Sequence, residues 1–379
     1  MRRILLTAVL LAAAPAVANA QASQFGVRGL GIPGRAISTR TFGSGGAFGM
    51  FDPESSINPV SLAEVKLLTA TFNGLQDFRH EETPSGTASL RESRFPQVVV
   101  VGPLRRVPAA LGVSFSNYTS RDFSLASSAT IDLRGSPVVV TDTFSSRGGL
   151  SDLRFAGAYR AGDKWVFGGS VHIITGSTRL SLVRSFADSN FLAERQRAEV
   201  SYTGVGVDLG IMRKFGQRFS VAGLIRSDGH ARLDLDSVRV ARVDLPYAFG
   251  LAARWRVGSK LDLAGEAVVR TWSAANSDVL EQGGVGAENT LALAFGGEFT
   301  PNPRRPTRRP LRFGVRYGTL PFPLQAGQQA HEVGVSVGTG LRFAQQRAGV
   351  DLGLEQVWRS GGDFSERAFL VAIGVRIQP

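Results

Sequence analysis

The second half of the chain alternates between apolar residues and polar or small residues with a period of two. In LPYAFGLAARWRV, residues 245–257, the odd positions are apolar, whereas Gly250, Arg254 and Arg256 stand at even positions. Successive side chains of a β-strand point to opposite faces, so this pattern predicts a strand with one apolar face and one small or charged face. The same alternation recurs in residues 260–271, 311–317, 333–343 and 369–377.

Less regular versions of this pattern cover most of the remaining chain. They lie at residues 65–72, 95–101, 109–118, 137–144, 153–159, 165–173, 200–211, 219–225, 291–299 and 350–358. Strands of nine or more residues can cross a bilayer at a tilt, and a closed barrel leaves no sheet edge exposed. We therefore predict an all-β fold, a transmembrane antiparallel β-barrel of about 14 strands. A soluble β-sandwich is the alternative that alternation by itself leaves open.

Residues 1–20 differ from the rest of the chain. MRRILLTAVLLAAAPAVANA has two arginines, an apolar run from Ile4 to Val17, and small residues at Ala18 and Ala20. This is the pattern of a secretory signal peptide, and the apolar run is too short for a membrane-spanning helix. We expect residues 1–20 to be cleaved at export, residues 21–62 to form an N-terminal segment, and residues 63–379 to form the barrel.

Charged residues follow the strand pattern. The chain has 43 basic and 31 acidic residues, and those at the even positions of the distal strands would line a barrel interior. The predicted lumen charges are Arg254, Arg256, Glu266, Arg270, Arg312, Arg316 and Arg342. Because the basic residues are spread in this way, no nucleic-acid partner is expected.

One local concentration of arginine stands apart from this pattern, in PNPRRPTRRP at residues 301–310. Its prolines cannot continue a strand ladder, so it is expected to be a solvated connection. Contact with lipopolysaccharide or other anionic lipid head groups is the alternative.

The sequence contains no motif typical of a catalytic site or a metal site. The chain has no cysteine and no GxSxG motif, and His80, His172, His230 and His331 are far apart. The predicted inward carboxylates are expected to pair with lumen arginines; they are Asp262, Glu266, Glu298, Asp351 and Glu355. We therefore expect no cofactor and no metal site, and an enzyme is the less favoured alternative.

The predicted connections fall into two kinds. Long polar connections are expected at residues 74–94, 176–199, 226–242, 273–289 and 318–332, and tight turns at residues 162–164, 215–218 and 258–260.

One of the long connections is unusually apolar, because it contains Phe186, Phe191 and Leu192. Asp188 or Ser189 could cap a short helix through residues 191–197. Our hypothesis is that this loop binds an apolar ligand; the alternative is a loop that packs on its neighbours.

The glycine-rich segment TFGSGGAFGMFDPESSINPVSL, residues 41–62, is not a phosphate-binding loop, because it lacks a GK[ST] ending and no strand leads into it. Its small residues, followed by Asp52 and then by Asn58 and Pro59, occur together with LPF at residues 320–322 and SVGTGLRF at residues 336–343. With this combination the chain resembles the FadL/OMPP1/TodX family of outer-membrane transporters for hydrophobic compounds. The resemblance implies that the N-terminal segment forms a plug inside the barrel, with Gly43, Gly45, Gly46, Asp52, Asn58 and Pro59 among its residues.

The resemblance also implies a function. It points to the outer membrane of a Gram-negative-type bacterium and to diffusive uptake of hydrophobic small molecules such as long-chain fatty acids, whose carboxylate the lumen arginines could meet. The expected partners are the ligand, outer-membrane lipids and lipopolysaccharide, and a monomer is expected. The alternative is a porin-like, structural or protein-binding barrel without lipid transport.

Overall fold

The structure is a computed structural model that describes residues 23–83, 86–133, 135–236, 238–281, 284–302, 309–345 and 347–379. The expected signal peptide at residues 1–20 lies outside these ranges. Within them, no helix has the length and the apolar character needed to cross a membrane.

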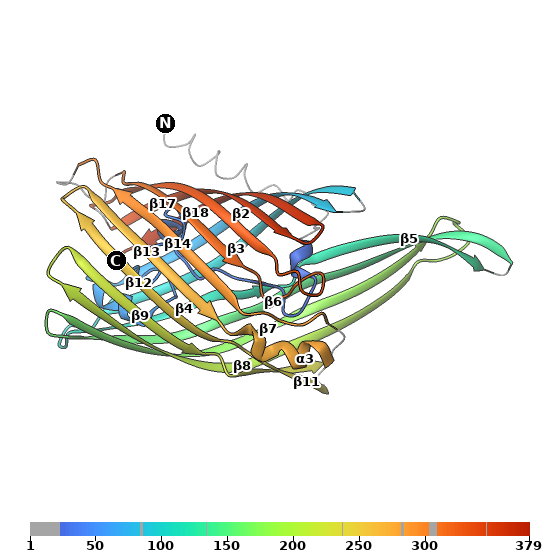
Figure 1. Cartoon of the computed structure of the whole chain (residues 1–379), viewed down its shortest axis with the longest axis horizontal. Coiled ribbons are helices and arrows are strands. Elements are labelled where there is room, and N and C mark those ends of the chain that lie inside the picture. Colours follow the sequence, from blue (N-terminus) through green and yellow to red (C-terminus); the bar gives the residue numbers. More distant parts are fainter. Residues whose placement is uncertain are drawn as a thin grey trace.

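Fourteen antiparallel strands form a closed barrel, in which β18 pairs with β2 (Figure 1). The predicted fold class, an all-β barrel of about 14 strands, is therefore confirmed. The barrel strands are β2 (Thr69–Thr83), β3 (Gly86–Pro103), β4 (Ala109–Ser120), β6 (Ser136–Ala161), β7 (Trp165–Phe186), β8 (Glu194–Phe215), β9 (Phe219–Ser227), β12 (Tyr247–Val257), β13 (Leu261–Arg270), β14 (Thr290–Phe299), β15 (Leu311–Thr319), β16 (His331–Phe343), β17 (Ala348–Gly361) and β18 (Phe364–Ile377).

The other elements belong to the N-terminal segment or to the connections. The segment contains η1 (Gln24–Gly26), β1 (Ile32–Pro33), α2 (Thr39–Phe42) and η2 (Pro59–Glu64). The connections contain β5 (Phe123–Leu133), β10 (His230–Leu235), β11 (Val238–Asp244), η3 (Trp272–Ala275) and α3 (Asn276–Glu281).

The period-two pattern separates the two faces of the barrel wall. On β12, Phe249, Leu251 and Trp255 are exposed on the outside, whereas Ala248 and Ala252 are buried. The same contrast appears on β15 and β16. A continuous apolar outer surface of this kind is typical of a barrel that contacts lipid.

The two ends of the barrel differ in their connections. At one end, which we call the short-turn end, the predicted tight turns are present, and Gly162, Gly216 and Gly258 adopt φ values of 66°, 65° and 68°. The first barrel strand begins and the last barrel strand ends at this same end, where Ile377 of β18 pairs with Ala70 of β2. The opposite end, the long-loop end, carries the helices η3 and α3 and the longer connections.

Three of the expected long loops are wrong, because residues 74–94, 176–199 and 226–242 form largely paired strands. The helix expected over residues 191–197 is also absent, because β8 starts at Glu194. The strands expected at residues 137–144 and 153–159 are parts of one long strand, β6. Beyond the barrel wall both faces of a strand meet water. The apolar contrast that marks a strand in the sequence is therefore lost, although the backbone ladder continues.

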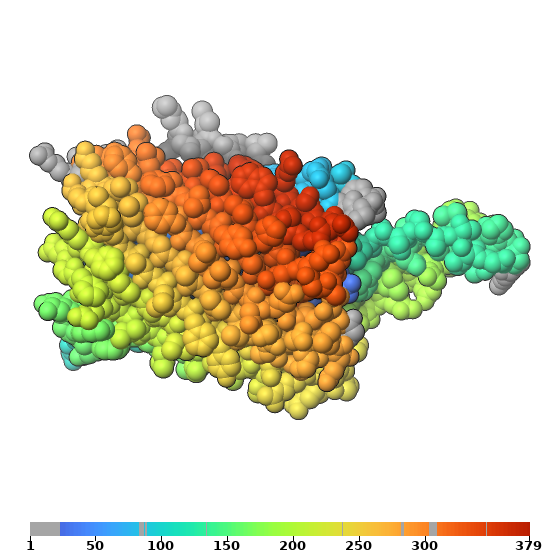
Figure 2. Space-filling model, in the orientation of Figure 1, coloured from blue at the N-terminus to red at the C-terminus, as the bar shows by residue number. Residues whose placement is uncertain are grey.

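β5 and the outer parts of β6, β7 and β8 form a sheet that extends beyond the barrel, which we call the projecting sheet. Figure 2 shows it as a separate extension at the right of the molecule. β5 pairs with β6 along its length, and β6 and β7 stay paired from the barrel to Phe186. The chain segment that sequence analysis treats as an apolar loop is therefore the tip of this sheet.

The N-terminal segment, residues 23–64, lies against the inner wall of the barrel (Figure 1, blue). Residues 41–52 are all buried. The wall carries glycines at which an added Cβ would come within 3 Å of the segment. Gly250, Gly296, Gly314, Gly338 and Gly353 face residues 41–52, Gly374 faces Thr39, and Gly168 and Gly210 face residues 58–60. These inward-facing glycines therefore provide the space that the segment occupies.

We predict that Gly314→Ala loosens the segment. The new Cβ would lie 2.2 Å from the backbone of Ser44, and overpacking of this kind costs about 1–3 kcal/mol. Limited proteolysis of the folded barrel should then cleave residues 23–64 faster than in the wild type.

The matched control is Gly223→Ala on the outer face of β9, where the nearest neighbour of the new Cβ is 3.5 Å away. This variant should keep wild-type protection. Equal protection of the segment in both variants would contradict the packing described here.

Candidate functional site

Asp52 organises the first half of the N-terminal segment. Its carboxylate accepts hydrogen bonds from Ser38 Oγ (2.5 Å), from Thr41 Oγ1 (2.8 Å) and from the Glu54 amide (3.2 Å). Ser38 Oγ in turn accepts the Thr41 amide and caps α2. Asp52 therefore joins the start of α2 to the Asp-Pro turn.

Asn58 and Pro59 start η2 and connect it to the wall. Asn58 Oδ1 accepts the Val60 amide at 3.2 Å, and Pro59 occupies the first turn, where a missing N–H is harmless. Asn58 Nδ2 donates to the carbonyl of Gly223 at 3.3 Å.

The predicted segment glycines lie earlier in the same segment. Gly43 packs on Gly338 of the wall, and Gly45 and Gly46 have φ values of 71° and 98°, which glycine adopts readily. All six residues predicted for the segment therefore lie in the lumen. Their action as a plug stays a prediction.

Two clusters of arginines and carboxylates fix the segment to the wall. In the first, Arg40 donates to both oxygens of Glu298, at 3.0 and 3.1 Å. Arg312 joins Glu298 (2.7 Å) to Asp351 (2.8 Å), and Arg342 contacts the other oxygen of Asp351 at 2.8 Å. The predicted lumen arginines Arg312 and Arg342 thus belong to one network of ion pairs, in which they share Asp351.

The second cluster is centred on Arg316. Arg35 of the segment donates to both oxygens of Glu355, at 2.7 and 3.0 Å, and Arg316 also binds Glu355, at 2.7 Å. Arg316 and Arg359 share Glu332. Removing one partner of such buried pairs leaves an uncompensated charge, so these contacts hold the segment strongly in place.

Burial and neighbouring charges also act on the ionisable groups of the segment. Burial raises the pKa of the Glu54 carboxyl, although Arg376, 2.9 Å away, works in the opposite direction. The Glu298 carboxylate raises the pKa of Arg40. For Arg35, burial and the charge of Arg316 lower the pKa despite the nearby Glu355 carboxylate.

The other predicted lumen charges have separate environments. Arg254 pairs with Asp262 at 2.5 Å, and Glu266 accepts the Met50 amide at 3.0 Å instead of an arginine. Arg256 must be corrected: it is exposed at the short-turn end of β12 and has no ion pair with the described residues. Alternation assigns a residue to a face, but it does not say how close to the end of the barrel that residue lies.

Arg270 differs from Arg312, Arg316 and Arg342. It is partly buried on β13, and its guanidinium makes no hydrogen bond or ion pair with any residue that the structure describes. It lines a cavity instead.

One polar cluster in the lumen is not apparent from the sequence pattern. Arg226 binds Asp152 at 2.8 Å and Asp228 at 2.6 Å, and the Tyr118 hydroxyl donates to Asp228 at 2.7 Å. His172 is fully buried, with Nδ1 3.4 Å from an oxygen of Asp152. These residues come from the first part of the chain, between β4 and the loop after β9, where the alternation of apolar and polar residues is less regular. The sequence signal that could have revealed the cluster is the charge of residues at inward positions. Across the described residues, no group of three or more His, Asp or Glu could hold a metal ion.

Two cavities border residues 33–37 of the segment. The larger, about 180 Å³, is lined by Tyr118, Arg226, Glu266 and Arg270 among others. The smaller, about 100 Å³, includes Asn73, Arg94, Pro96 and Glu355 in its lining. Pro33, Gly34, Arg35 and Ile37 line both cavities, as do Asn117, Arg316 and Glu332 of the wall, so residues 33–37 lie between the two cavities.

The wall is interrupted beside these cavities. β3 and β4 pair only from Gln97 and Ser116 to the short-turn end, and the preceding residue, Pro96, has no N–H to donate. Beyond Ser116, β1 takes the place of β3: Ile32 pairs with Ser120, and the Gly34 amide donates to the Tyr118 carbonyl at 2.7 Å. The N-terminal segment therefore closes a break in the barrel wall.

Aromatic residues cover the long-loop side of the lumen. Trp272 of η3 is fully buried between Phe322 and Tyr118, with ring centroids 5.3 and 6.3 Å away. Leu30 belongs to the same apolar cluster. The LPF motif therefore helps to cover the lumen.

The three apolar residues predicted to bind a ligand lie outside the lumen. Phe186 ends β7 and packs against Phe191, with ring centroids 5.4 Å apart, and Leu192 is 91% exposed. They sit at the tip of the projecting sheet, and their contact with a ligand stays a hypothesis.

The fold is similar to solved hydrocarbon-channel structures. A FadL homologue from Pseudomonas aeruginosa aligns with a TM-score of 0.63 at 15% identity, over 92% of this chain and 99% of that chain. The Pseudomonas putida toluene transporter TodX aligns with a TM-score of 0.57 at 12% identity, over 91% and 98%. The monoaromatic hydrocarbon channel CymD gives 0.55 at 14% identity, over 91% and 98%. At these identities the likeness is one of fold.

Sequence comparison identifies the family separately. No curated protein matches the chain. A family model described as BamG matches residues 1–220, which include the N-terminal segment and the barrel strands from β2 to the start of β9. Since this match covers more than half of the 379 residues, the chain belongs to the BamG family.

Proposed function

We propose that this protein spans the outer membrane, with its short-turn end in the periplasm, and admits hydrophobic small molecules to its lumen. The apolar outer wall, the tight turns at one end and the longer connections at the other support this orientation. In this orientation lipopolysaccharide, which lies in the outer leaflet, would surround the long-loop end of the barrel. The connection that contains residues 301–310 is at the short-turn end and would not contact it. Residues 303–308 of that connection lie outside the described part of the chain.

The observation that carries the proposal is the larger cavity beside the wall break. Its volume of about 180 Å³ is comparable with an engineered cavity of about 150 Å³ that binds benzene. Leu224, Ala248, Val268 and Ala292 supply apolar lining, and Arg270 is available for a polar group of the ligand. The size favours a ligand of about one ring, whereas a long-chain fatty acid would also have to extend into the smaller cavity.

The packing suggests which part of the segment moves. Residues 41–52 are buried against wall glycines, whereas residues 32–34, which precede the Arg35 ion pair, are only partly buried, and Pro33 and Gly34 border both cavities. Moving β1 away from β4 would join the cavities to the wall break without breaking the contacts of Arg40. A ligand would then pass beside the segment, while most of the segment stays in place.

A second candidate function is a structural or protein-binding barrel without transport. It is favoured by the filling of the lumen, because the ion pairs of Arg35 and Arg40 hold the segment from residue 35 onward against the wall. The same filling argues against a porin-like pore.

A disulfide that locks β1 to β4 should stop uptake. Ile32→Cys with Ser120→Cys places two cysteines at paired positions of antiparallel strands, where side chains are close enough to bridge. The chain has no other cysteine. We expect the oxidised variant to lose most uptake of labelled toluene and fatty acids, and reduction to restore it.

The control lock is Glu82→Cys with Ser365→Cys, a paired position between β2 and β18. It should leave uptake unchanged whether oxidised or reduced. Full uptake by the oxidised 32–120 variant would reject movement of β1, and absence of uptake by the wild type for every compound tested would favour the structural barrel.

In planar bilayers the wild type should show no large, steady ion conductance, because the segment fills the lumen. Deletion of residues 43–58 removes the stretch around Asp52 and the glycines, and it should create a conducting pore. A porin-sized conductance in the wild type would instead support the porin-like alternative.

A further inference from the structure

An exposed arginine on the outer wall has an unusual setting. Arg213 of β8 lies 4.8 Å from the ring centroids of both Trp165 and Phe215. It has no ion pair with the described residues, and it is close to the short-turn end. Cation–π contacts of this kind hold the guanidinium beside the two rings. Its N–H groups have no hydrogen-bond partner among the described residues, so they can meet an oxyanion such as a phosphate.

Further basic residues surround this arginine. Lys164 lies in the β6–β7 turn, where its carbonyl accepts the Lys214 amide at 2.8 Å, and Arg218 lies in the β8–β9 turn. Both are exposed. Asp163 is the one acid among the described residues of the short-turn connections, whose basic residues are Lys66, Arg105, Arg106, Lys164, Arg218, Lys260, Arg309 and Arg347.

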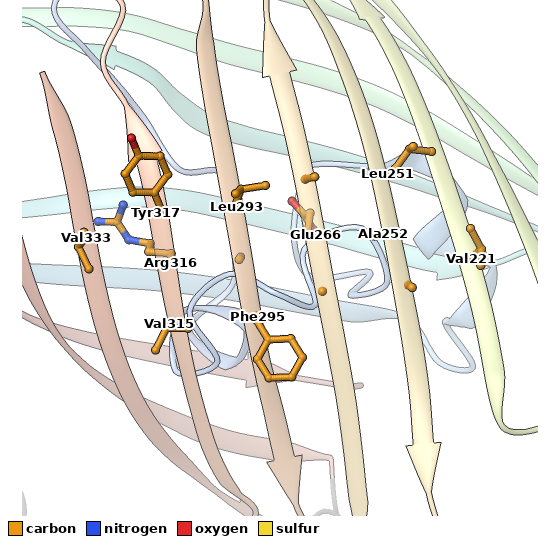
Figure 3. Close-up of a pocket in the computed structure, with 14 residues that line it drawn as sticks. Val221, Leu251, Ala252, Glu266, Leu293, Phe295, Val315, Arg316, Tyr317 and Val333 are labelled. Atoms are coloured by element: carbon orange, nitrogen blue, oxygen red, sulfur yellow. The ribbon is translucent and has the colours of Figure 1, made fainter. Parts of the chain in front are cut away.

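An apolar depression of about 680 Å³ lies on the same wall (Figure 3). Figure 3 shows Val221 and Leu251 on one side of it and Leu293, Phe295 and Tyr317 on the other. Between them the wall carries small residues, namely Ala253, Gly265 and Ala267. The depression arises because these three positions lack bulky side chains.

The strand register connects the arginine to the depression. Trp165 pairs with Arg213, Arg213 with Val221, and Val221 with Ala253, all on the outer face. Ala253 is four residues from Val257, the last residue of β12, or about 14 Å along the strand. Half of the bilayer hydrocarbon is about 15 Å thick, so an acyl chain whose phosphate is near Arg213 can reach the depression.

From this continuity we propose that the outer wall binds one anionic phospholipid of the periplasmic leaflet. Its phosphate would contact Arg213, Lys164 and Arg218, and one acyl chain would lie over Ala253 and Gly265. The proposal rests on the membrane orientation given under the proposed function, but it requires no transport. The two can therefore fail separately.

Lipids with brominated acyl chains provide the test, because bromine quenches nearby tryptophan. Trp255 lies on the outer face of β12, two residues from Ala253. In phosphatidylcholine nanodiscs, brominated phosphatidylglycerol should quench the wild type more than brominated phosphatidylcholine at the same fraction. Trp255→Phe should remove most of the difference and thereby assign the signal.

Two variants test the two halves of the site. The triple variant Lys164→Gln, Arg213→Gln and Arg218→Gln should lose the preference for phosphatidylglycerol, by about fivefold per basic residue removed. Gly265→Leu should reduce quenching by both lipids. It should also fold, because an added Cβ at this position has its nearest neighbours at 3.8 Å.

The matched control removes three basic residues elsewhere at the same end: Arg105→Gln, Arg106→Gln and Arg347→Gln. It should keep the preference. Equal quenching of the wild type by both lipids, or an equal loss in the control, would overturn the proposal. Displacement of the brominated lipid by lipopolysaccharide at lower concentration than by phosphatidylglycerol would also overturn it, because the site would then fit the other leaflet.

Discussion

The N-terminal segment packs closely on a glycine-lined inner wall, and its ion pairs and the two cavities are arranged around this contact. Without side chains at Gly296, Gly314 and Gly338, the segment backbone can approach the wall backbone directly. This approach brings Arg35 and Arg40 to the wall carboxylates Glu355 and Glu298. Packing and charge therefore fix the same stretch of chain.

This arrangement divides the lumen into a fixed part and an adaptable part. Between residues 41 and 52 every residue is buried. Residues 32–34, which precede the Arg35 ion pair, are partly buried, lie beside two cavities, and pair with β4 where β3 no longer does. Regions with few buried contacts open at lower free energy, so a passage is expected beside the segment.

Much of the barrel follows from the sequence, because the lipid-facing wall makes alternation strict. The expected segments 245–257, 311–317 and 333–343 are examples that nearly coincide with the observed strands β12, β15 and β16. Outside the wall the same reasoning fails. In the projecting sheet, polar residues occur on both faces of the strands. Their sequence therefore predicts polar loops, although the strands are paired.

The site is only partly readable from the sequence. The residue types at Asp52, Asn58 and Pro59 indicate turns, and the inward face indicates Arg312 and Arg316. The carboxylate that each segment arginine binds is far away in the sequence: Glu298 is about 260 positions from Arg40, and Glu355 is about 320 positions from Arg35. Alternation along a strand carries no information about such pairs. The break beside Pro96 is equally hidden, because β1 is too short to show a pattern.

Amide hydrogen exchange in lipid nanodiscs can show whether the glycine-lined wall holds the segment. Residues 41–52 should exchange as slowly as the barrel strands, whereas the amides of Ile32 and Gly34 should exchange faster and slow down when a hydrophobic ligand is added. Rapid exchange throughout residues 41–52 would contradict this packing, because the glycine-lined wall would then not hold the segment.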